Sequence, residues 1–331
     1  MSLEKLKELQ NEINAGNRRA LARAITLVES TRADHRKEAL SLMDSLNTNN
    51  KKSIRIGLTG TPGVGKSTFI ESFGLMLINK GLKVAVLAVD PTSKRSGGSI
   101  LGDKTRMELL SREPKAFIRP SPSGNLQGGV ALRTREAIAL CEAAKFDIII
   151  VETVGVGQSE VMVSEMTDIF LLLIAPGGGD ELQGVKRGIM EIADLILVNK
   201  ADGDLEAAAI RTSADYSGAL RLLRKRKIDP ESFPKVLTLS ALESIGLDNA
   251  WNEIEELNNW RHKTGVCSEN RKHQSLKWFN SEVKNRIIGR IEADAEITKL
   301  TTELGDAVFT GEITPERAVD TVLSTIIKNK L

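Results

Sequence analysis

Residues 60–67 constrain what this chain can fold into more than any other stretch. They read GTPGVGKS, which matches the phosphate-binding pattern G-x-x-x-x-G-K-[ST]. A β-rich run at 54–59 precedes the pattern and a helical run follows it, as a P-loop requires. The glycines let backbone N–H groups turn around phosphates, and the following helix adds its positive end. The pattern predicts these nucleotide-binding residues: Gly60, Thr61, Pro62, Gly63, Val64, Gly65, Lys66, Ser67 and Thr68.

Two side chains of this stretch have distinct expected roles. Lys66 would reach the β- and γ-phosphates, which makes it a candidate catalytic residue. The Ser67 hydroxyl would bind Mg²⁺.

Composition narrows the class of protein. The chain has 331 residues, 41% of them hydrophobic, which is enough for one large α/β domain with additions. A net charge of +2 gives no reason to expect nucleic acid as a partner, and no run of about 18 apolar residues predicts a membrane span. Cys141 and Cys267 are far apart in the sequence, which favours free thiols in the reducing cytoplasm.

The order of patterns predicts three regions. Residues 1–48 form short helices, two of them capped by Asn17 and Asp34, that serve either as a packing addition or as a partner surface. Residues 49–262 alternate apolar strands with helices, as a doubly wound, mostly parallel α/β sheet requires. Residues 263–331 are helical again. Strands are expected at 54–59, 83–90, 147–152, 169–174, 195–199 and 235–239, with a further short strand at 116–120.

Two features of the C-terminal half leave alternatives open. An amphipathic helix is expected over 272–299, and the last helix carries one apolar stripe along 318–327. That stripe must be buried either on its own domain or on a second subunit. The basic run 221–227 is either a solvated helix face or a phosphate-binding patch.

Acidic residues follow two of the expected strands. Asp90 and Glu152 come after buried runs, and ligands of open α/β sheets lie at the carboxyl ends of strands. Carboxylates there would hold Mg²⁺ or its waters, and Asp103, in a long glycine-rich loop, would add a further ligand. The backbone N–H of Gly155 would lie within reach of a γ-phosphate.

The tetrapeptide Asn199-Lys200-Ala201-Asp202 predicts which base is bound. Guanine presents an N1–H and an amine side by side, and the Asp202 carboxylate can accept both. Adenine has a lone pair at N1, so the carboxylate would lack a donor there. Lys200 would lie along the base, and Asn199 would tie the loops together. A second loop would meet the guanine carbonyl through backbone N–H groups of Ser240, Ala241 and Leu242.

Several motifs together resemble one family of proteins. The chain is similar to the methylmalonyl-CoA mutase-associated G-protein chaperones, the MeaB/ArgK type of the SIMIBI-class P-loop GTPases. The resemblance covers nearly the whole chain and rests on NRRALARAIT at 17–26, VDPT at 89–92, LGDKTR at 101–106, ETVGVGQSE at 152–160 and GDELQG at 179–184.

This resemblance implies a function beyond nucleotide binding. It implies GTP hydrolysis coupled to the protection or cofactor loading of adenosylcobalamin-dependent methylmalonyl-CoA mutase, by a homodimer with a C-terminal dimerisation arm. It also implies that Asp90, Asp103 and Glu152 lie near Mg²⁺ with Ser67. The implied switch loops are residues 91–106, 153–163 and 177–188.

One expected catalytic feature differs from the general GTPase pattern. Val156 occupies the place where a water-orienting glutamine usually follows the switch glycine, and Gln158 is the nearest substitute. We therefore expect slow turnover of the isolated protein and completion of the site by its partner.

Three other functions remain open. They are a kinase acting on a transport protein, a non-enzymatic GTP switch and a nickel-delivery GTPase. The scattered histidines and the lack of a Cys-x-x-Cys pair weaken the nickel-delivery function.

Overall fold

The computed structural model describes residues 3–30, 32–46, 53–89, 107–120, 127–153, 159–177, 187–223, 226 and 228–330. It divides into two compact units, Met1–Gln274 and Ser275–Leu331. The three domains expected from the sequence, with boundaries after residues 48 and 262, stay a prediction.

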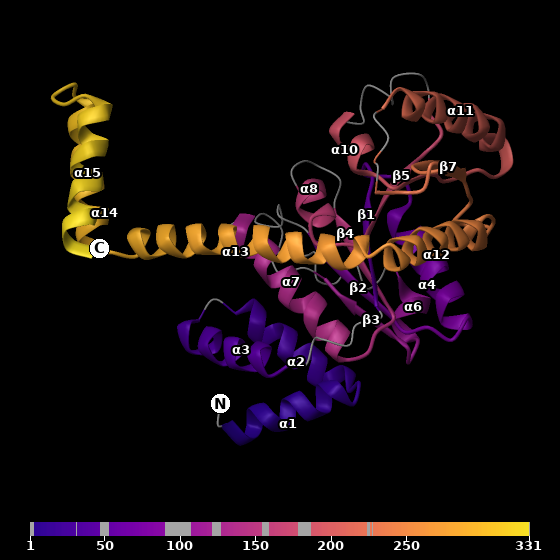
Figure 1. Ribbon diagram of the computed structural model, residues 1–331, viewed down its shortest axis with the longest axis horizontal. Helices are drawn as coiled ribbons and strands as arrows, with labels where there is room; N and C mark the ends of the chain where they lie inside the picture. The colour runs from indigo at the N-terminus through magenta and orange to yellow at the C-terminus, as the bar shows by residue number, and fades with distance from the viewer. Residues whose placement is uncertain are drawn as a thin grey trace. The chain divides into compact units, whose positions relative to one another are not determined.

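A seven-stranded parallel sheet forms the centre of the first unit (Figure 1). Its strand order is β3-β2-β4-β1-β5-β6-β7. Strands β2, β3 and β4 lie on one side of β1, with β4 next to it, and β5, β6 and β7 lie on the other, as the doubly wound prediction requires. Each predicted strand is present within one residue at either end, and the short run at 116–120 is a strand too. The strands are β1 (Ile54–Thr59), β2 (Val84–Val89), β3 (Ala116–Arg119), β4 (Ile148–Thr153), β5 (Ile169–Ile174), β6 (Leu195–Val198) and β7 (Lys235–Thr238).

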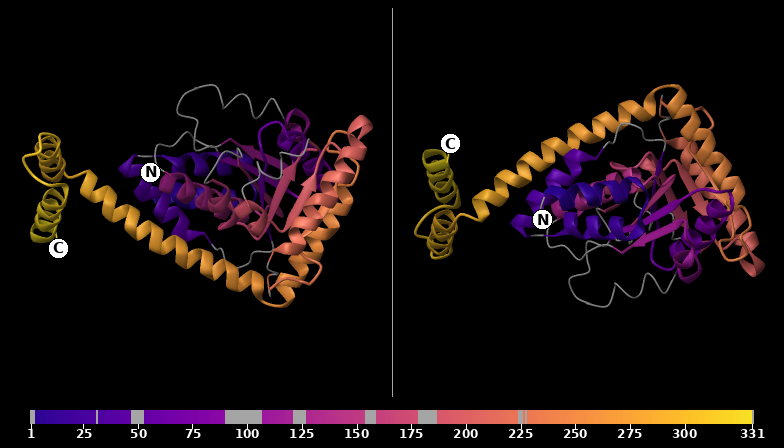
Figure 2. Two further views of the ribbon diagram at one scale, coloured as in Figure 1. Left: turned by 90° about the horizontal axis from the view of Figure 1, so that it is seen from above. Right: turned by 90° about the horizontal axis from the view of Figure 1, so that it is seen from below.

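Helices cover both faces of this sheet because alternate strand residues point to opposite sides. In β1 and β4, Ile56 and Ile150 belong to one hydrophobic core, whereas Ile149 and Val151 belong to the other. The first core packs under α4 (Lys66–Asn79), α6 (Glu108–Arg112) and α12 (Leu247–Lys263). The second packs under α7 (Gln127–Ala143), α8 (Ser159–Ser164), α10 (Arg187–Ile192) and α11 (Glu206–Leu222). Helices on both sides of the sheet can be seen in Figure 2.

Three N-terminal helices extend the second core. They are α1 (Leu3–Asn14), α2 (Arg18–Glu29) and α3 (Ala33–Ser45). The predicted cap at Asn17 is confirmed, because its side chain accepts hydrogen bonds from the N–H groups of Arg19 and Ala20. The predicted cap at Asp34 is wrong: Arg32 occupies the cap position, and the Asp34 carboxylate pairs with the Arg32 guanidinium instead.

Within the basic run at 221–227, Arg226 does not lie on a helix face. Helix α11 ends at Leu222, and the Arg226 guanidinium donates to Ala193 O at 2.9 Å. Arg226 also pairs with the buried Asp194 carboxylate at 2.9 Å. Arg226 therefore links the end of α11 to the segment before β6.

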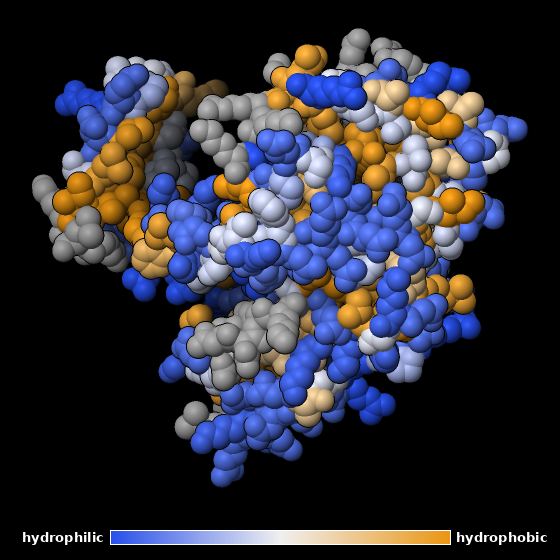
Figure 3. All heavy atoms as spheres, turned by 45° about the vertical axis from the view of Figure 1, so that its right-hand side comes forward, coloured by the Kyte–Doolittle hydropathy of each residue, from blue (hydrophilic) through white to orange (hydrophobic). Residues whose placement is uncertain are grey.

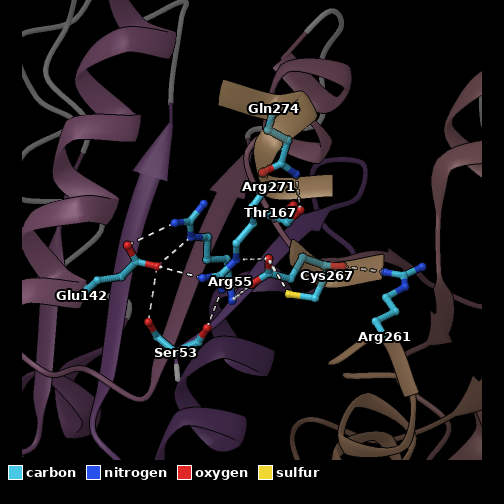
Figure 4. A network of polar contacts seen from close by, with 9 residues as sticks. Ser53, Arg55, Glu142, Thr167, Arg261, Cys267, Arg271 and Gln274 are labelled. Atoms are coloured by element: carbon cyan, nitrogen blue, oxygen red, sulfur yellow. Dashed lines mark hydrogen bonds and ion pairs between the residues drawn. The ribbon is translucent and has the colours of Figure 1, made fainter. Parts of the chain in front are cut away.

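A polar network joins the amino ends of β1 and β5 to the start of α13 (Val266–Glu292) (Figure 4). The Arg271 guanidinium donates to both carboxylate oxygens of Asp168, at 2.8 and 2.6 Å, and to Ser53 O at 2.7 Å. Arg55 pairs with the buried Glu142 at 2.8 Å. Burial raises the pKa of Asp168, but the hydrogen bonds and charge of Arg271 outweigh it and hold that pKa below its usual value. The network lies at the strand edge opposite the P-loop.

The second unit is helical, with α14 (Ala295–Phe309) packed against α15 (Pro315–Lys330). The helix expected over 272–299 is wrong at its end, because α13 stops at Glu292 and Asp294 caps α14 through the N–H groups of Glu296 and Ile297. Hydrophobic side chains remain exposed on these helices (Figure 3). They are Leu276, Phe279, Val283, Ile287, Ile288, Phe309, Val319, Leu323 and Ile327.

Among the described residues, no helix has both the length and the apolar character that crossing a membrane requires.

Candidate nucleotide site

The predicted P-loop lies between the end of β1 and the start of α4, at the carboxyl edge of the sheet. Gly65 occupies the cap position of α4 with a φ of +93°. A Cβ atom on Gly60 would overlap the carbonyl oxygen of Leu173 in β5. Glycine is therefore needed at Gly60 for close approach to the neighbouring strand and at Gly65 for its left-handed backbone.

Lys66 points back onto this loop. Its Nζ donates to Gly60 O at 2.7 Å and to Thr61 O at 3.3 Å. Burial lowers the pKa of Lys66, and the negative charges of Glu152 and Glu160 act against that shift. The ammonium group is thus held at the loop by carbonyl oxygens and by nearby carboxylates.

The carboxyl ends of β1 and β4 are joined beside the loop. Leu58 is the register partner of Glu152, and the Thr153 hydroxyl donates to the Thr59 hydroxyl at 2.8 Å, both side chains being buried. Glu152 lies inside β4, one residue before its end, rather than after the strand. Ser67 is partly buried in the first turn of α4.

Four predicted site residues lie outside the described residues: Asp90, Asp103, Gly155 and Gln158. So do most of the expected switch loops at 91–106, 153–163 and 177–188. Within the described ranges, no group of three acidic, histidine or cysteine side chains could hold a metal ion.

Sequence reasoning did not assign a role to Glu160. This side chain is 1% exposed, lies in the first turn of α8, and influences Lys66 electrostatically. In the sequence, Glu160 stands three residues before the apolar Val163, and residues three apart share a helix face. The structure shows that Val163 is fully buried. An acid on the buried face of a helix next to a P-loop is a candidate functional residue.

Asn199 connects the P-loop to the predicted base-recognition loops. Its Nδ2 donates to Val64 O at 2.9 Å, and its Oδ1 accepts from the Ala241 N–H at 2.9 Å. The side chain is 2% exposed. The tie between loops expected of Asn199 is therefore present.

Lys200 makes a second connection to the P-loop. Its Nζ donates to Gly63 O at 2.9 Å, and its own φ is +58°, a strained value for a residue with a side chain. Such strain persists only where the surroundings hold it, and it is typical of functional sites.

Asp202 presents an open acceptor. Its Oδ1 atom is buried and has no hydrogen-bond partner within the part of the chain that the structure describes. A buried carboxylate oxygen without a donor is costly, and an N–H group of a ligand would satisfy it.

The second predicted loop offers fewer donors than expected. The Ser240 N–H donates to Ile245 O at 3.0 Å, and the Ala241 N–H is taken by Asn199. Within the described residues, the Leu242 N–H has no such bond, and its side chain is 73% exposed. Of the three N–H groups expected to contact a guanine carbonyl, the Leu242 N–H is therefore the one that stays available among the described residues.

The amino-acid sequence is similar to one protein family and to several GTPases over most of its length. The family model described as "Methylmalonyl Co-A mutase-associated GTPase MeaB" matches residues 21–296. A "Putative GTPase" of Caulobacter vibrioides is 50% identical over 319 residues, which is 96% of this chain and 97% of that protein. "GTPase ArgK" of Escherichia coli is 45% identical over 310 residues, covering 94% of this chain and 93% of that one.

A solved structure shares the fold over almost the full chain. It is described as "Crystal structure of LAO/AO transport system kinase", with 36% identity and a TM-score of 0.76. The match covers 98% of this chain and 99% of that chain.

Proposed function

This chain belongs to the MeaB family of P-loop GTPases, and we propose that it hydrolyses GTP with Mg²⁺ while assembled with an adenosylcobalamin-dependent methylmalonyl-CoA mutase. In that assembly it protects the mutase or controls the loading of its cofactor. We place it in the cytoplasm as a homodimer.

One observation carries the choice of nucleotide. The Asp202 Oδ1 atom is buried and lacks a donor among the described residues, and it lies in the loop that Asn199 and Lys200 bond to the P-loop. Guanine supplies two adjacent donors to such a carboxylate, whereas adenine supplies none at N1. This supports GTP and GDP as the bound nucleotides.

The residues present fit a nucleotide with Mg²⁺. Residues 60–68 would hold the phosphates, with the start of α4 and the Lys66 ammonium facing them. Bound Mg²⁺ supplies positive charge that neutralises phosphate oxygens. Its proposed ligands are Ser67, Asp90, Asp103 and Glu152.

The proposed catalytic set is small. Lys66 would exchange its two loop carbonyls for phosphate oxygens, and the Gly155 N–H would donate to the γ-phosphate. Glu152, near the end of β4, would hold Mg²⁺ or its waters, and Gln158 is the candidate for orienting the attacking water. With Val156 in the usual glutamine position, hydrolysis would be slow until a partner completes the site.

Exposed apolar residues of the second unit support the homodimer. On α15, Val319, Leu323 and Ile327 recur every four residues and are 50–60% exposed. Residues four apart lie on one helix face, and such a face is buried when a second copy packs on it. The family description supports the mutase as the further partner.

A second candidate is a kinase acting on a transport protein, because the related solved structure carries that description. A kinase would transfer the γ-phosphate to a protein hydroxyl, whereas a GTPase releases it as inorganic phosphate. Incubation with labelled GTP and with labelled ATP, followed by separation of protein from free phosphate, distinguishes the two.

The experiment for the mutase partnership uses purified proteins. The chain is mixed with an adenosylcobalamin-dependent mutase with and without GTP, and both co-elution and phosphate release are measured. We expect a complex and faster hydrolysis, with Lys66→Ala abolishing the acceleration. Separate elution with an unchanged rate would contradict the partnership while leaving GTP hydrolysis itself intact.

A further inference from the structure

We propose that Ser72 is a positioning residue for guanine recognition: from α4, its hydroxyl orients the Leu242 N–H donor of the 240–242 loop. This inference rests on the proposed function, because it assumes a guanine nucleotide at the site.

The contact that carries the inference joins two distant parts of the sequence. The Ser72 Oγ donates to Ala241 O at 2.6 Å, across 169 positions of the chain. Ser72 is partly buried on the helix that follows the P-loop, and Ala241 is 1% exposed. Water is therefore a poor substitute donor for this carbonyl.

The hydrogen bond from Ser72 to Ala241 O also determines where the next N–H group points. Ala241 C=O and Leu242 N–H belong to the same planar, trans peptide group, so they point in opposite directions. Fixing the carbonyl on Ser72 therefore fixes the direction of the Leu242 N–H. That N–H is the donor left for the guanine carbonyl in this loop.

The neighbouring peptide group is held as well. The Ala241 N–H donates to Asn199 Oδ1, so Ala241 is fixed on both sides by side chains that come from different elements. Asn199 is also bonded to the P-loop through Val64 O. Ser72 adds a restraint that Asn199 does not supply, because Ser72 bonds to the peptide group that carries the Leu242 N–H. A donor held in place before the ligand arrives avoids the cost of ordering it on binding.

The test compares the binding of three nucleotides by the wild type and by Ser72→Ala. GDP has the O6 acceptor; 6-thio-GDP has sulfur there and keeps the N1–H and the amine; IDP keeps O6 and N1–H and lacks the amine. Calorimetric titration of Ser72→Ala should show about tenfold weaker GDP binding, because one hydrogen bond is lost at the carbonyl. Its preference for GDP over 6-thio-GDP should fall toward one, whereas its preference for GDP over IDP, which reads Asp202, should stay as in the wild type.

Two controls separate orientation from damage. Ser72→Thr keeps a hydroxyl and should restore the GDP to 6-thio-GDP preference. Ser45→Ala, which removes a hydroxyl-to-carbonyl bond of the same 2.6 Å length on α3, should leave all three affinities unchanged.

The outcomes separate the proposed role of Ser72 from the proposed binding of a guanine nucleotide. If Ser72→Ala weakens all three nucleotides equally, the residue is only structural and the inference is overturned. If the wild type binds GDP and Ser72→Ala leaves every affinity unchanged, the inference is again overturned but the proposed function stands. If the wild type fails to bind GDP, the proposed function fails first.

Discussion

Gly65 and Asn199 lie so close together that a Cβ atom on Gly65 would be 2.6 Å from the Asn199 Nδ2 atom. The Asn199 amide can move away only by breaking hydrogen bonds, because its Nδ2 donates to Val64 O and its Oδ1 accepts from the Ala241 N–H. The glycine that caps α4 thus leaves the space that the Asn199 amide occupies.

We predict that Gly65→Ala disrupts nucleotide binding. The methyl group would displace the Asn199 amide, and alanine would have to adopt a φ of +93°. The expected result is a loss of GDP affinity of 100-fold or more, on the order of 3 kcal/mol, together with a lower free energy of unfolding. Calorimetric titration and denaturant unfolding measure the two effects.

Gly81→Ala is the matched control for this prediction. Gly81 has a φ of +92°, but a Cβ atom there would meet nothing within 4 Å. It should lose about 1 kcal/mol of stability from backbone strain and keep its GDP affinity. Equal losses of affinity in the two variants would show that the contact with Asn199 is unimportant.

We predict that Asp202→Asn changes which purine is bound. The amide replaces one acceptor by a donor, so guanine loses a partner for its donors, whereas xanthine, with a carbonyl in place of the amine, gains one. GDP affinity should fall by about 100-fold and xanthosine diphosphate should become the tighter ligand. The exposed Asp204 is the control, because Asp204→Asn should change neither affinity. An Asp202→Asn variant that keeps the wild-type order of preference would contradict base recognition at this carboxylate.

We predict that the Asp168–Arg271 pair makes stability depend on acid pH. The pKa of Asp168 is lower in the folded protein than in the unfolded chain, so the stabilisation is complete above the unfolded value and is lost as pH falls through the folded one. At pH 7, Asp168→Asn should lower the free energy of unfolding by about 3 kcal/mol, since it removes the close carboxylate partner of Arg271 and leaves the longer, 3.6 Å contact with Glu142. Urea unfolding at several pH values should show the gap between wild type and variant narrowing below pH 4.

The exposed pair of Lys80 and Asp248 is the comparison for this effect. The Lys80 Nζ and Asp248 Oδ1 atoms are 2.9 Å apart, but the Asp248 side chain is 69% exposed. Asp248→Asn should therefore cost at most about 1 kcal/mol at pH 7. An Asp168→Asn variant no more harmful than this one would show that the network does not stabilise the start of α13.

We predict that the exposed side chains of α15 hold two copies of the chain together. The double variant Leu323→Asp with Ile327→Asp places two charges on that face and should convert a dimer into a monomer in analytical ultracentrifugation. The control is Leu222→Asp, because Leu222 is 86% exposed on α11 and belongs to the first unit. A wild type that sediments as a monomer at micromolar concentration would refute the dimer.

Local patterns were sufficient for much of this fold. Continuous apolar runs predicted the strands, since a parallel strand covered on both faces has no polar side, and Asn17 predicted a helix cap from its own chemistry. Asp34 failed as a cap because a nearby Arg32 competes for its carboxylate, which residue type alone does not reveal. Motif spacing likewise predicted the P-loop and the Asn199 tie.

Long-range pairs were beyond sequence reasoning. The Ser72 hydroxyl and the Ala241 carbonyl, or Asp168 and Arg271, meet only because the sheet order brings separate segments together. Nothing in the local sequence of Ser72 distinguishes it from any other helical serine. The role of Glu160 depended in the same way on knowing which face of α8 is buried.

The most direct test is a calorimetric comparison of GTP with ATP on the wild-type chain and on Lys66→Ala, in the presence of Mg²⁺. We predict that the wild type binds GTP at least about 100-fold more tightly than ATP, because Asp202 needs the donors of guanine. We also predict that Lys66→Ala loses GTP turnover. Equal affinity for the two nucleotides, or undiminished turnover without Lys66, would contradict GTP hydrolysis at this site.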